Sequence, residues 1–407
     1  MDVVREYRNI IEGIESGDDI FFSSGKFYKN DRMMAISIPD KNYRVLSLEG
    51  AFMTPSLNVS GPQMSTFDLT DMTQTERIEG ERLTFFNDKW ITDSDLQLLY
   101  DRVIDIQAIS GHWNGSVLHP NGKFYLMGLT SSAADAARVY DPIMDTFDTI
   151  ELNSALGGYG IAVAQNGLLY YSPGAISDSI PVIDPNTNEA VKYISVPSTN
   201  HYDGPVAAPN GKIYFMPSNA TNIMVVDTLN DDEVEFIEHA NIPGGSSKWR
   251  TSFYSNGKIY GIPAEASSIL VINTEDHEDI TLLGSFPGGD KWRGGVVAPN
   301  GKIFCSPSFS HKFILVIDSN DDSFRQYPIA FGNFTGAIYV PLNNRVYFMP
   351  RQTDTEYIMS MDADTEELKA MDIFVGGASY TGGGVTSDGV IYLMPGNRIS
   401  ILELGIL

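Results

Sequence analysis

The sequence predicts an all-β fold, a seven-bladed β-propeller, preceded by a small mixed α/β N-terminal region. The prediction depends on a unit of 43–46 residues that recurs along the chain, a turn dipeptide at the same place in each copy, and Val/Ile/Tyr/Phe-rich runs too short for helices. Four antiparallel strands per repeat of this length are typical of a propeller blade. We therefore expect residues 1–100 to form an N-terminal anchoring region and residues 101–407 to form the propeller.

The turn dipeptide is the most regular feature of the repeat. Its second residue lies at Gly122, Gly167, Gly211, Gly257, Gly301, Asn344 and Gly389. Asn-Gly readily adopts positive φ at both positions, which favours the type I′ turn of a two-residue hairpin. We therefore expect a tight hairpin between the first and second strands of each blade.

The runs around each turn predict the strands in order. The first strand is rich in Gly, Ala and Ser, as in 160–164, 204–208, 294–298 and 382–385, which suits the crowded channel. The second is apolar and mostly ends at Pro, as in 212–217, 258–263, 302–307 and 390–395. The third mostly ends at Asp or Asn, as in 138–141, 224–227 and 315–318, and a more polar fourth strand follows.

The seventh copy ends at Leu407 after its third strand. Residues 102–109 lie just before the first copy and resemble the fourth strands at 233–239 and 367–374. We expect residues 102–109 to complete the last blade. Such closure leaves no free sheet edge.

The first hundred residues do not follow the repeat. Apolar residues between Val3 and Ile14 fall on one face of a short amphipathic helix, and residues 92–101 also predict a short helix. Strand-like alternation occurs at 20–29, 33–39 and 43–49, and the stretch from about 50 to 80 predicts an extended arm. We expect this region to dock on the propeller, on another copy of the chain, or in a larger assembly.

Composition narrows the function classes. The formal net charge of −25 opposes contact with phosphate backbones, so no nucleic-acid partner is expected. The single cysteine, Cys305, excludes an internal disulfide and Cys-based zinc sites. The N-terminal residues lack the apolar core of a signal peptide, and no stretch is apolar enough to span a bilayer, so we expect cytoplasmic synthesis without membrane insertion. The sequence leaves homo-oligomerisation open.

The candidate site is a set of residues at the start of each first strand, which the topology should gather at one mouth of the channel. An aromatic residue occupies this place in every copy: Trp113, Tyr159, Tyr202, Trp249, Trp292, Phe334 and Tyr380. Their neighbours add His112, His201, Lys248, Arg250, Lys291 and Arg293. Aromatic faces stack on sugars and Arg binds carboxylates or sulfates, so these residues form the predicted ligand site. The alternative is that the aromatics wedge the blades together and the charges are solvated.

No metal, cofactor or catalytic site is expected. Aspartates close the third strands at Asp141, Asp184, Asp227, Asp318 and Asp362, and their recurrence favours hairpin turns over a calcium site. The first strands offer no converging Glu, Asp, Asn and His, and the chain has neither a G-x-S-x-G nor an H-E-x-x-H motif. Cys305 lies inside a β-run, which favours a buried thiol over a nucleophile.

The repeat consensus is W-x-G-G-V-x-A-P-N-G-K-I-Y-x-x-P followed by I-L-V-I-D. Over about 111–407 it resembles YVTN-like and kelch-like β-propeller repeats. It lacks the Trp-Asp signature of WD40 repeats, the Asp box of sialidases and the kelch double glycine. The resemblance implies the fold and not an activity. A propeller behind a non-repetitive arm is also similar to virion-associated tail or capsid appendages of phages, which implies a virion location.

The sequence thus predicts a non-enzymatic binding protein. Residues 1–100 would anchor it in an assembly, and the propeller would present a recognition surface to a glycan or protein receptor. Two alternatives remain: an intracellular protein-interaction scaffold, and a lactonase-like metal-dependent hydrolase.

Overall fold

The computed structural model describes five short N-terminal strands and most of the chain after residue 97. The described ranges are 20–23, 26–29, 32–33, 83–86, 89–92, 98–105, 113–128, 137–153, 156, 158–173, 177–197, 201–308, 311–329, 333–351, 357–374, 380–387, 389–396 and 400–406. The chain divides into two compact units, Met1–Leu99 with Leu407, and Tyr100–Ile406.

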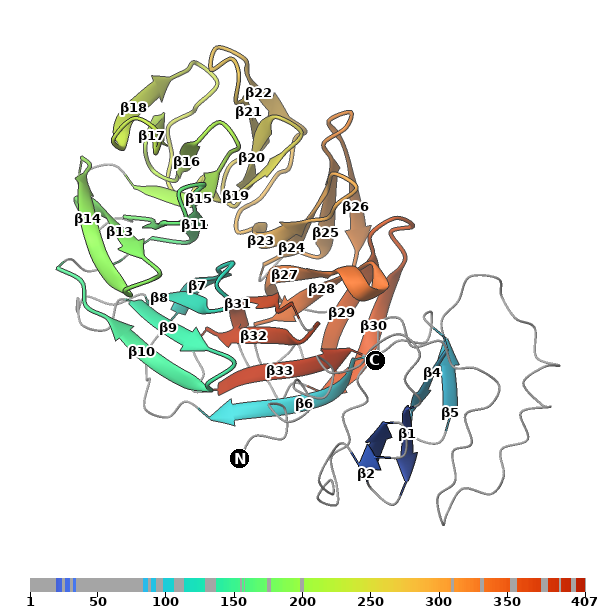
Figure 1. The fold of residues 1–407 in the computed structure, drawn as a ribbon. Helices are drawn as coiled ribbons and strands as arrows, with labels where there is room; N and C mark the ends of the chain where they lie inside the picture. The colour runs from blue at the N-terminus through green and yellow to red at the C-terminus, as the bar shows by residue number, and fades with distance from the viewer. Residues whose placement is uncertain are drawn as a thin grey trace. The chain divides into compact units, whose positions relative to one another are not determined.

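Seven four-stranded antiparallel sheets form the blades of a β-propeller, as predicted (Figure 1). Blade one contains β7 (Trp113–Leu118), β8 (Phe124–Gly128), β9 (Ala137–Asp141) and β10 (Thr146–Ile150). Blade two contains β11 (Ile161–Val163), β12 (Leu169–Tyr171), β13 (Ser179–Asp184) and β14 (Glu189–Ser195). Blade three contains β15 (Tyr202–Ala207), β16 (Lys212–Pro217), β17 (Asn222–Asp227) and β18 (Glu233–Glu238).

The remaining blades repeat this pattern. Blade four contains β19 (Trp249–Ser255), β20 (Lys258–Pro263), β21 (Ile269–Asn273) and β22 (Ile280–Leu283). Blade five contains β23 (Trp292–Val297), β24 (Lys302–Pro307), β25 (Phe313–Asp318) and β26 (Ser323–Pro328). Blade six contains β27 (Phe334–Val340), β28 (Arg345–Pro350), β29 (Tyr357–Asp362) and β30 (Leu368–Phe374). Blade seven contains β31 (Tyr380–Val385), β32 (Ile391–Pro395), β33 (Ser400–Ile406) and β6 (Leu98–Asp105).

The first strands line the central channel. Each contacts the first strand of the next blade, and β31 of blade seven contacts β7 of blade one, so the ring closes. Small residues permit this approach: a Cβ added at Gly294 would lie 2.2 Å from the carbonyl oxygen of Thr335 in the next blade. The small-residue composition of these strands therefore follows from crowding at the channel, as predicted.

Blade seven is completed by a strand from before the first repeat. The sheet order is β31-β32-β33-β6, and Figure 1 shows β6 beside β33. The strand β6 begins at Leu98 and ends at Asp105, four residues earlier than the expected 102–109. The helix predicted over 92–101 is wrong for residues 98–101, because these residues extend the strand that pairs with β33.

Most of the hairpin turns differ from the predicted type I′. In blade one the N–H of Gly122 donates to the carbonyl of His119 over 2.9 Å, and the N–H of His119 donates to the carbonyl of Lys123. Gly122 has φ +84°, whereas Asn121 is not among the described residues with positive φ. This is a three-residue loop, a type I turn followed by a left-handed residue. Blades two, three, five and seven repeat the same pair of bonds.

Proline explains part of this difference. In three of these blades Pro120, Pro209 and Pro299 precede the Asn, and the fixed φ of Pro suits the second position of a type I turn. A type I′ turn would need positive φ at both central residues. Blade four has no Pro there, and Asn256 and Gly257 have φ +49° and +77°, the predicted type I′ geometry.

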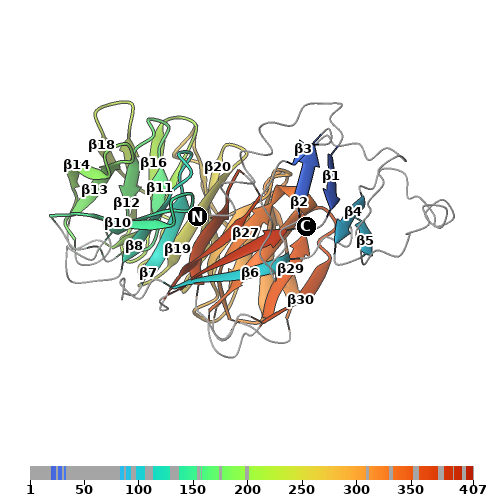
Figure 2. The same cartoon turned by 60° about the horizontal axis from the view of Figure 1, so that its bottom comes forward.

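The hydrophobic core lies between neighbouring blades. One cluster joins Tyr202 of blade three to blade two, another joins Trp249 to blade three, and a third joins Trp292 to blade four. A further cluster joins Trp113 of blade one to Tyr392 of blade seven. Figure 2 shows the blades from the side. The aromatic residue that begins each of these first strands therefore packs its blade onto the preceding one.

Tyrosine hydroxyls add a second repeated link between blades. They lie four residues after the turn Asn or equivalent and reach a loop of the next blade. Tyr125 donates to the carbonyl of Pro185 (3.1 Å), Tyr170 to Asp232 (2.6 Å) and Tyr260 to Asp322 (2.6 Å). Sequence analysis did not predict this link, although Tyr recurs at this position in the second strands.

Asx turns follow the third strands, as expected. In each case the aspartate Oδ1 accepts the backbone N–H two residues later, from Ile143, Asn186, Leu229, Asn320 and Asp364 to Asp141, Asp184, Asp227, Asp318 and Asp362. These carboxylates are thus used in local turns.

The described part of the first unit contains only strands. A three-stranded sheet contains β1 (Ile20–Ser23), β2 (Lys26–Lys29) and β3 (Arg32–Met33), and a hairpin pairs β4 (Leu83–Phe86) with β5 (Lys89–Thr92). The strands β1 and β2 fall within the predicted 20–29. The predicted helix over 3–14, most of the strand 33–39, the strand 43–49 and the arm over 50–80 lie outside the described residues. Within the described residues, no helix is long and apolar enough to cross a membrane.

Candidate binding site at the channel mouth

The aromatic residues of the predicted site are mostly buried. Trp113, Tyr202, Trp249, Trp292, Phe334 and Tyr380 are each 3 % exposed or less, whereas Tyr159 is half-buried. The indole N–H of Trp249 donates to the carbonyl of Ser268 (2.9 Å), and that of Trp292 to the carbonyl of Phe313 (2.8 Å). This burial corrects the expectation of a stacking surface for these six rings, because their faces already pack in the core.

The lysines of the two Lys-Trp-Arg triplets are also buried. The amine of Lys248 donates to the carbonyls of Ala220 (2.7 Å) and Gly245 (3.3 Å), and the amine of Lys291 donates to those of Ala264 (3.0 Å) and Gly288 (2.6 Å). Burial lowers the pKa of both amines, that of Lys248 to about 8. Each lysine therefore ties the loop before its strand to the preceding blade, which corrects its predicted place in the ligand site.

The arginines of the same triplets remain half-buried at the mouth. The guanidinium carbon of Arg250 lies 5.0 Å from the ring centroid of Tyr159, and its Nη2 donates to Ser247 Oγ over 2.8 Å. The Nε of Arg293 donates to Asp290 Oδ1 over 2.5 Å. Stacking on the ring and pairing with the carboxylate hold the two planar groups in defined orientations.

A third arginine, Arg351, belongs to this group. It directly follows Pro350 at the end of β28 and is half-buried. Burial lowers the pKa of Arg351, and the positive charges of Arg293 and Arg250 lower it further, against the opposing effects of Asp290 and Tyr159. Arg250, Arg293, Arg351 and the Tyr159 ring, from blades two, four, five and six, are called the arginine mouth below.

Sequence analysis missed Arg351, although the repeat marks it. The residue after the Pro of the second strand is small in the other copies that have this Pro: Gly174, Ser218, Ala264, Ser308 and Gly396. Arg351 is the one large, charged residue at this register position. Comparison of the second strands across repeats would have identified it.

An acidic residue lies at the edge of the same mouth. Asp203 is fully buried, and its Oδ1 accepts the backbone N–H of Tyr159 over 3.1 Å. His201 is half-buried, and its Nε2 lies 3.2 Å from Asp203 Oδ1. The second carboxylate oxygen of Asp203 is buried without a hydrogen-bond partner, and so is Arg250 Nε. Unsatisfied buried polar atoms cost about 1–3 kcal/mol each, which marks this side of the mouth as a place where a ligand or water could bind.

Predicted residue His112 lies outside the described residues. Of the predicted residues, four lie at the mouth in the structure: Arg250, Arg293, Tyr159 and His201. Three further residues join them there: Arg351, Asp203 and Asp290.

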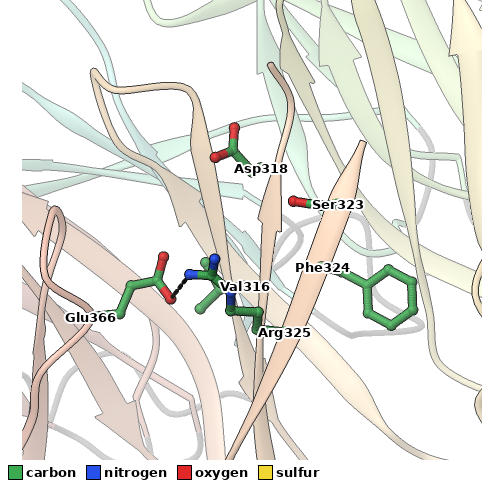
Figure 3. A pocket seen from close by; sticks show the side chains of 6 residues that line it. All are labelled: Val316, Asp318, Ser323, Phe324, Arg325 and Glu366. Atoms are coloured by element: carbon green, nitrogen blue, oxygen red, sulfur yellow. Dashed lines mark hydrogen bonds and ion pairs between the residues drawn. The ribbon is translucent and has the colours of Figure 1, made fainter. Parts of the chain in front are cut away.

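A pocket between blades five and six offers no comparable site (Figure 3). Its volume is about 10 Å³, which is at the lower limit for one water. Glu366 accepts bonds from Lys302 Nζ (2.5 Å), Arg325 Nη1 (3.1 Å) and the hydroxyl of Tyr327. Burial raises the pKa of Glu366, but these bonds outweigh it and hold the pKa below its usual value. This network joins two blades and leaves no room for a ligand.

The described residues contain neither a metal-ligand cluster nor an exposed thiol. Among the described residues, no group of three or more His, Cys, Asp and Glu side chains is placed to hold a metal ion. Cys305 is fully buried in β24, and burial raises the pKa of its thiol, so the thiolate form is disfavoured.

No protein-family model and no curated protein sequence matches the chain. Solved structures do. A catalytically inactive virginiamycin B lyase from Staphylococcus aureus, solved with quinupristin, is 13% identical and gives a TM-score of 0.59, covering 76% of this chain and 99% of that one. A chain of the mitotic checkpoint complex is 9% identical with a TM-score of 0.60, covering 81% and 99%. The WD40 repeats of RRP9 are 9% identical with a TM-score of 0.58, covering 77% and 100%. At these identities the similarity shows the fold alone.

Proposed function

We propose that this protein is a non-enzymatic recognition module whose propeller binds a protein partner at the arginine mouth. The observation that carries the proposal is the register of three arginines in neighbouring blades. Arg250 and Arg293 are the second residues of β19 and β23, and Arg351 follows Pro350, which pairs with Phe334 at the start of β27. Three guanidinium groups in one place are uncommon in a chain of net charge −25, and arginine is enriched where proteins bind partners.

The propeller suits such a role mechanically. Its first strands form a closed ring and its cores lie between blades, so the loops at the mouth stand on a rigid frame. A preorganised surface loses little entropy on binding. The chain of the mitotic checkpoint complex supplies a precedent by fold, because that chain belongs to a protein complex.

The N-terminal region has a separate part in the proposal. Residues 1–100 anchor the propeller in a larger assembly, and a virion is the location that the architecture suggested from sequence. Two features support this part: the region departs from the repeat, and its strands β1, β2, β4 and β5 each contain an aromatic residue. An interaction scaffold outside a virion would differ from this proposal only in what residues 1–100 bind. Recognition of a glycan receptor would differ from it only in the ligand of the propeller.

The test is a binding screen of the full-length chain on arrays of synthetic peptides and of glycans, beside the variant Arg250→Gln/Arg293→Gln. Selective binding to peptides that the variant loses supports the proposal. Selective binding to glycans alone would replace the protein partner with a glycan receptor. If neither array shows selective binding, or if the variant binds as the wild type does, the mouth is not the recognition surface.

A second candidate, an enzyme acting at the same mouth, is favoured by one observation. His201 Nε2 lies 3.2 Å from the buried carboxylate of Asp203 without forming a hydrogen bond to it, and a small rotation of the ring would make the pair that orients a general base. The similar lyase structure contains quinupristin, which provides a first substrate to try. Conversion of quinupristin followed by mass spectrometry, with His201→Gln as the comparison, tests this candidate. Turnover that the variant loses would favour the enzyme.

A further inference from the structure

We propose that the arginine mouth is a binding site for one carboxylate group, held by Arg250 and Arg351 with Arg293 beside them. The inference rests on the proposed function, because it names the chemistry that the mouth recognises. The inference adds to the proposed function a small ligand, whose binding can be measured before the partner is known.

The first argument is that Arg250 lacks a counter-charge. Its side chain contacts the Tyr159 ring and the hydroxyl of Ser247, and no carboxylate of the described residues lies within ion-pair distance of it. Its Nε is buried without a hydrogen-bond partner. By contrast, Arg293 pairs with Asp290 and Lys302 with Glu366.

The second argument is mutual repulsion. Arg351 is partly removed from water and experiences the positive charges of Arg293 and Arg250, which Asp290 and Tyr159 oppose in part. Like charges in a partly buried site destabilise the fold, because the low dielectric strengthens their repulsion. An anion bound among them would convert this repulsion into charge-assisted hydrogen bonds.

The third argument concerns the charge of the anion. Asp290 already pairs with Arg293 and also acts on Arg351, so the mouth holds one carboxylate beside its arginines. Lys291 and Glu265 lie nearby and offset each other, and Lys248 points its amine at two carbonyls behind the mouth. The remaining chain is strongly acidic and repels a dianion more than a monoanion. A singly charged carboxylate therefore fits better than sulfate or phosphate.

The fourth argument is geometric. A guanidinium group donates two parallel N–H bonds that match the two oxygens of a carboxylate. Arg250 is oriented by stacking on Tyr159 and by Ser247, and it stands on the first strand of blade four. Such a preorganised donor loses little side-chain entropy when the carboxylate binds.

The carboxylate could come from a peptide or from an acidic sugar, and the probes separate the two. The probes are acetyl-Gly-Gly-Ala with a free C-terminus, the same peptide with a C-terminal amide, N-acetylneuraminic acid and sodium sulfate. Each is titrated calorimetrically into the full-length chain at constant ionic strength. We expect saturable binding of the free-acid peptide or of the sugar acid, with no binding of the amide and weaker binding of sulfate.

The variants locate the site. Arg250→Gln and Arg351→Gln are each expected to weaken carboxylate binding by about tenfold or more, which is the effect of losing a hydrogen bond to a charged group. Arg250→Lys keeps the charge but not the planar pair of donors, so an intermediate loss is expected. Arg325→Gln removes the same charge from the outer strand β26 of blade five and should leave binding unchanged. Circular dichroism of each variant verifies folding, and Arg250→Lys keeps the test valid if Arg351→Gln does not fold.

The proposal is overturned if no carboxylate binds saturably, if sulfate binds more tightly than both carboxylates, or if Arg250→Gln binds as tightly as Arg325→Gln. These results would leave the proposed function standing where the full-length chain still selects peptides on the array through Arg250 and Arg293. Loss of selective array binding together with intact carboxylate binding would instead refute the protein partner and retain the site.

Discussion

Lys248 and Arg250 flank the same tryptophan, yet they serve different purposes. The amine of Lys248 is enclosed by two carbonyls and stabilises a loop, whereas the guanidinium of Arg250 lies half-buried at the mouth. Residues two apart in an extended segment share a face, so the triplet alone could not separate a structural cation from a functional one. In the structure Lys248 precedes β19, whereas Arg250 lies within it. Burial separates them.

The stability of the protein should depend on the protonation of Lys248. Its pKa is about 8 when folded and near 10.5 when unfolded, so the unfolded chain binds more protons between these values. Stability contributed by this group therefore rises as pH increases through that window. Between pH 7.5 and 9.5 the free energy of unfolding should rise by about 2 kcal/mol more in the wild type than in Lys248→Met. Urea unfolding at both pH values measures this difference in the free energy of unfolding. An equal pH dependence in the two proteins would refute the lowered pKa of Lys248.

At the level of single residues, sequence predicted the site in part. Arg250 and Arg293 could be predicted because the Lys-Trp-Arg triplet occurs in two successive repeats. Tyr159 could be predicted because every repeat has an aromatic residue there, and His201 because it precedes such a residue. The burial of Trp249 and Trp292 was one of two open interpretations, since a ring at a strand end can face either the channel or the next blade. Arg351 was not predicted because it occurs once, at a position where the other repeats that have this Pro contain a small residue.

At the scale of strands and turns, crowding at the channel decides which residues are tolerated. A Cβ at Gly294 would lie 2.2 Å from the Thr335 carbonyl oxygen of the next blade. Gly294→Ala should therefore lower the free energy of unfolding by about 1–3 kcal/mol, the usual cost of overpacking. Gly244→Ala is the control, since nothing lies within 4 Å of that position. Equal stability of the two variants in urea unfolding would show that the first strands are less crowded than described.

The tyrosine links between blades make a second prediction at this scale. Tyr260→Phe removes the bond to Asp322 Oδ1 and should lower the free energy of unfolding by about 1–2 kcal/mol. Tyr254→Phe removes a hydroxyl of a half-buried side chain in β19 and should change stability by less than about 0.5 kcal/mol. Thermal and urea unfolding of both variants compare the two. A larger loss in Tyr254→Phe would contradict the role given to the links.

The elements that the sequence predicted best are those that repeat. The second and third strands agree with expectation within one or two residues, because an apolar run bounded by a turn and by Pro or Asp allows little choice. The turn type was predicted correctly only at Asn256, since Pro120 and its equivalents fix φ in a way that the dipeptide alone does not show. The strand β6 was missed at its start because Leu98 to Tyr100 also fit a short helix, and only pairing with β33 decides between them.

At the scale of the whole molecule, closure of the ring through β6 should control stability. Without β6 the sheet of blade seven would end in the exposed edge of β33. A chain that begins at residue 107 should therefore melt at a lower temperature and aggregate more than one that begins at residue 97. Thermal unfolding with light scattering measures both effects. Identical melting and solubility would show that β6 is dispensable for closure.

The cations of the propeller differ in whether a carboxylate pairs with them. Lysines at or just before the start of second strands pair with nearby carboxylates. Lys123 pairs with Asp141 and Lys258 with Asp322, so these two cations are already partnered. At the arginine mouth Arg293 likewise pairs with Asp290, whereas no carboxylate of the described residues lies within ion-pair distance of Arg250. This contrast is the basis for placing recognition at the channel mouth.

The central claim is that the arginine mouth binds a carboxylate, and the most direct measurement is NMR of the arginine Nε–Hε groups of the full-length chain. Signals assigned through single Arg→Lys variants are followed while acetyl-Gly-Gly-Ala is added. We expect the signals of Arg250, Arg293 and Arg351 to shift together and to saturate, and those of Arg138, Arg325 and Arg345 to stay in place. Absence of shifts at the first three, or equal shifts at all six, would contradict the claim.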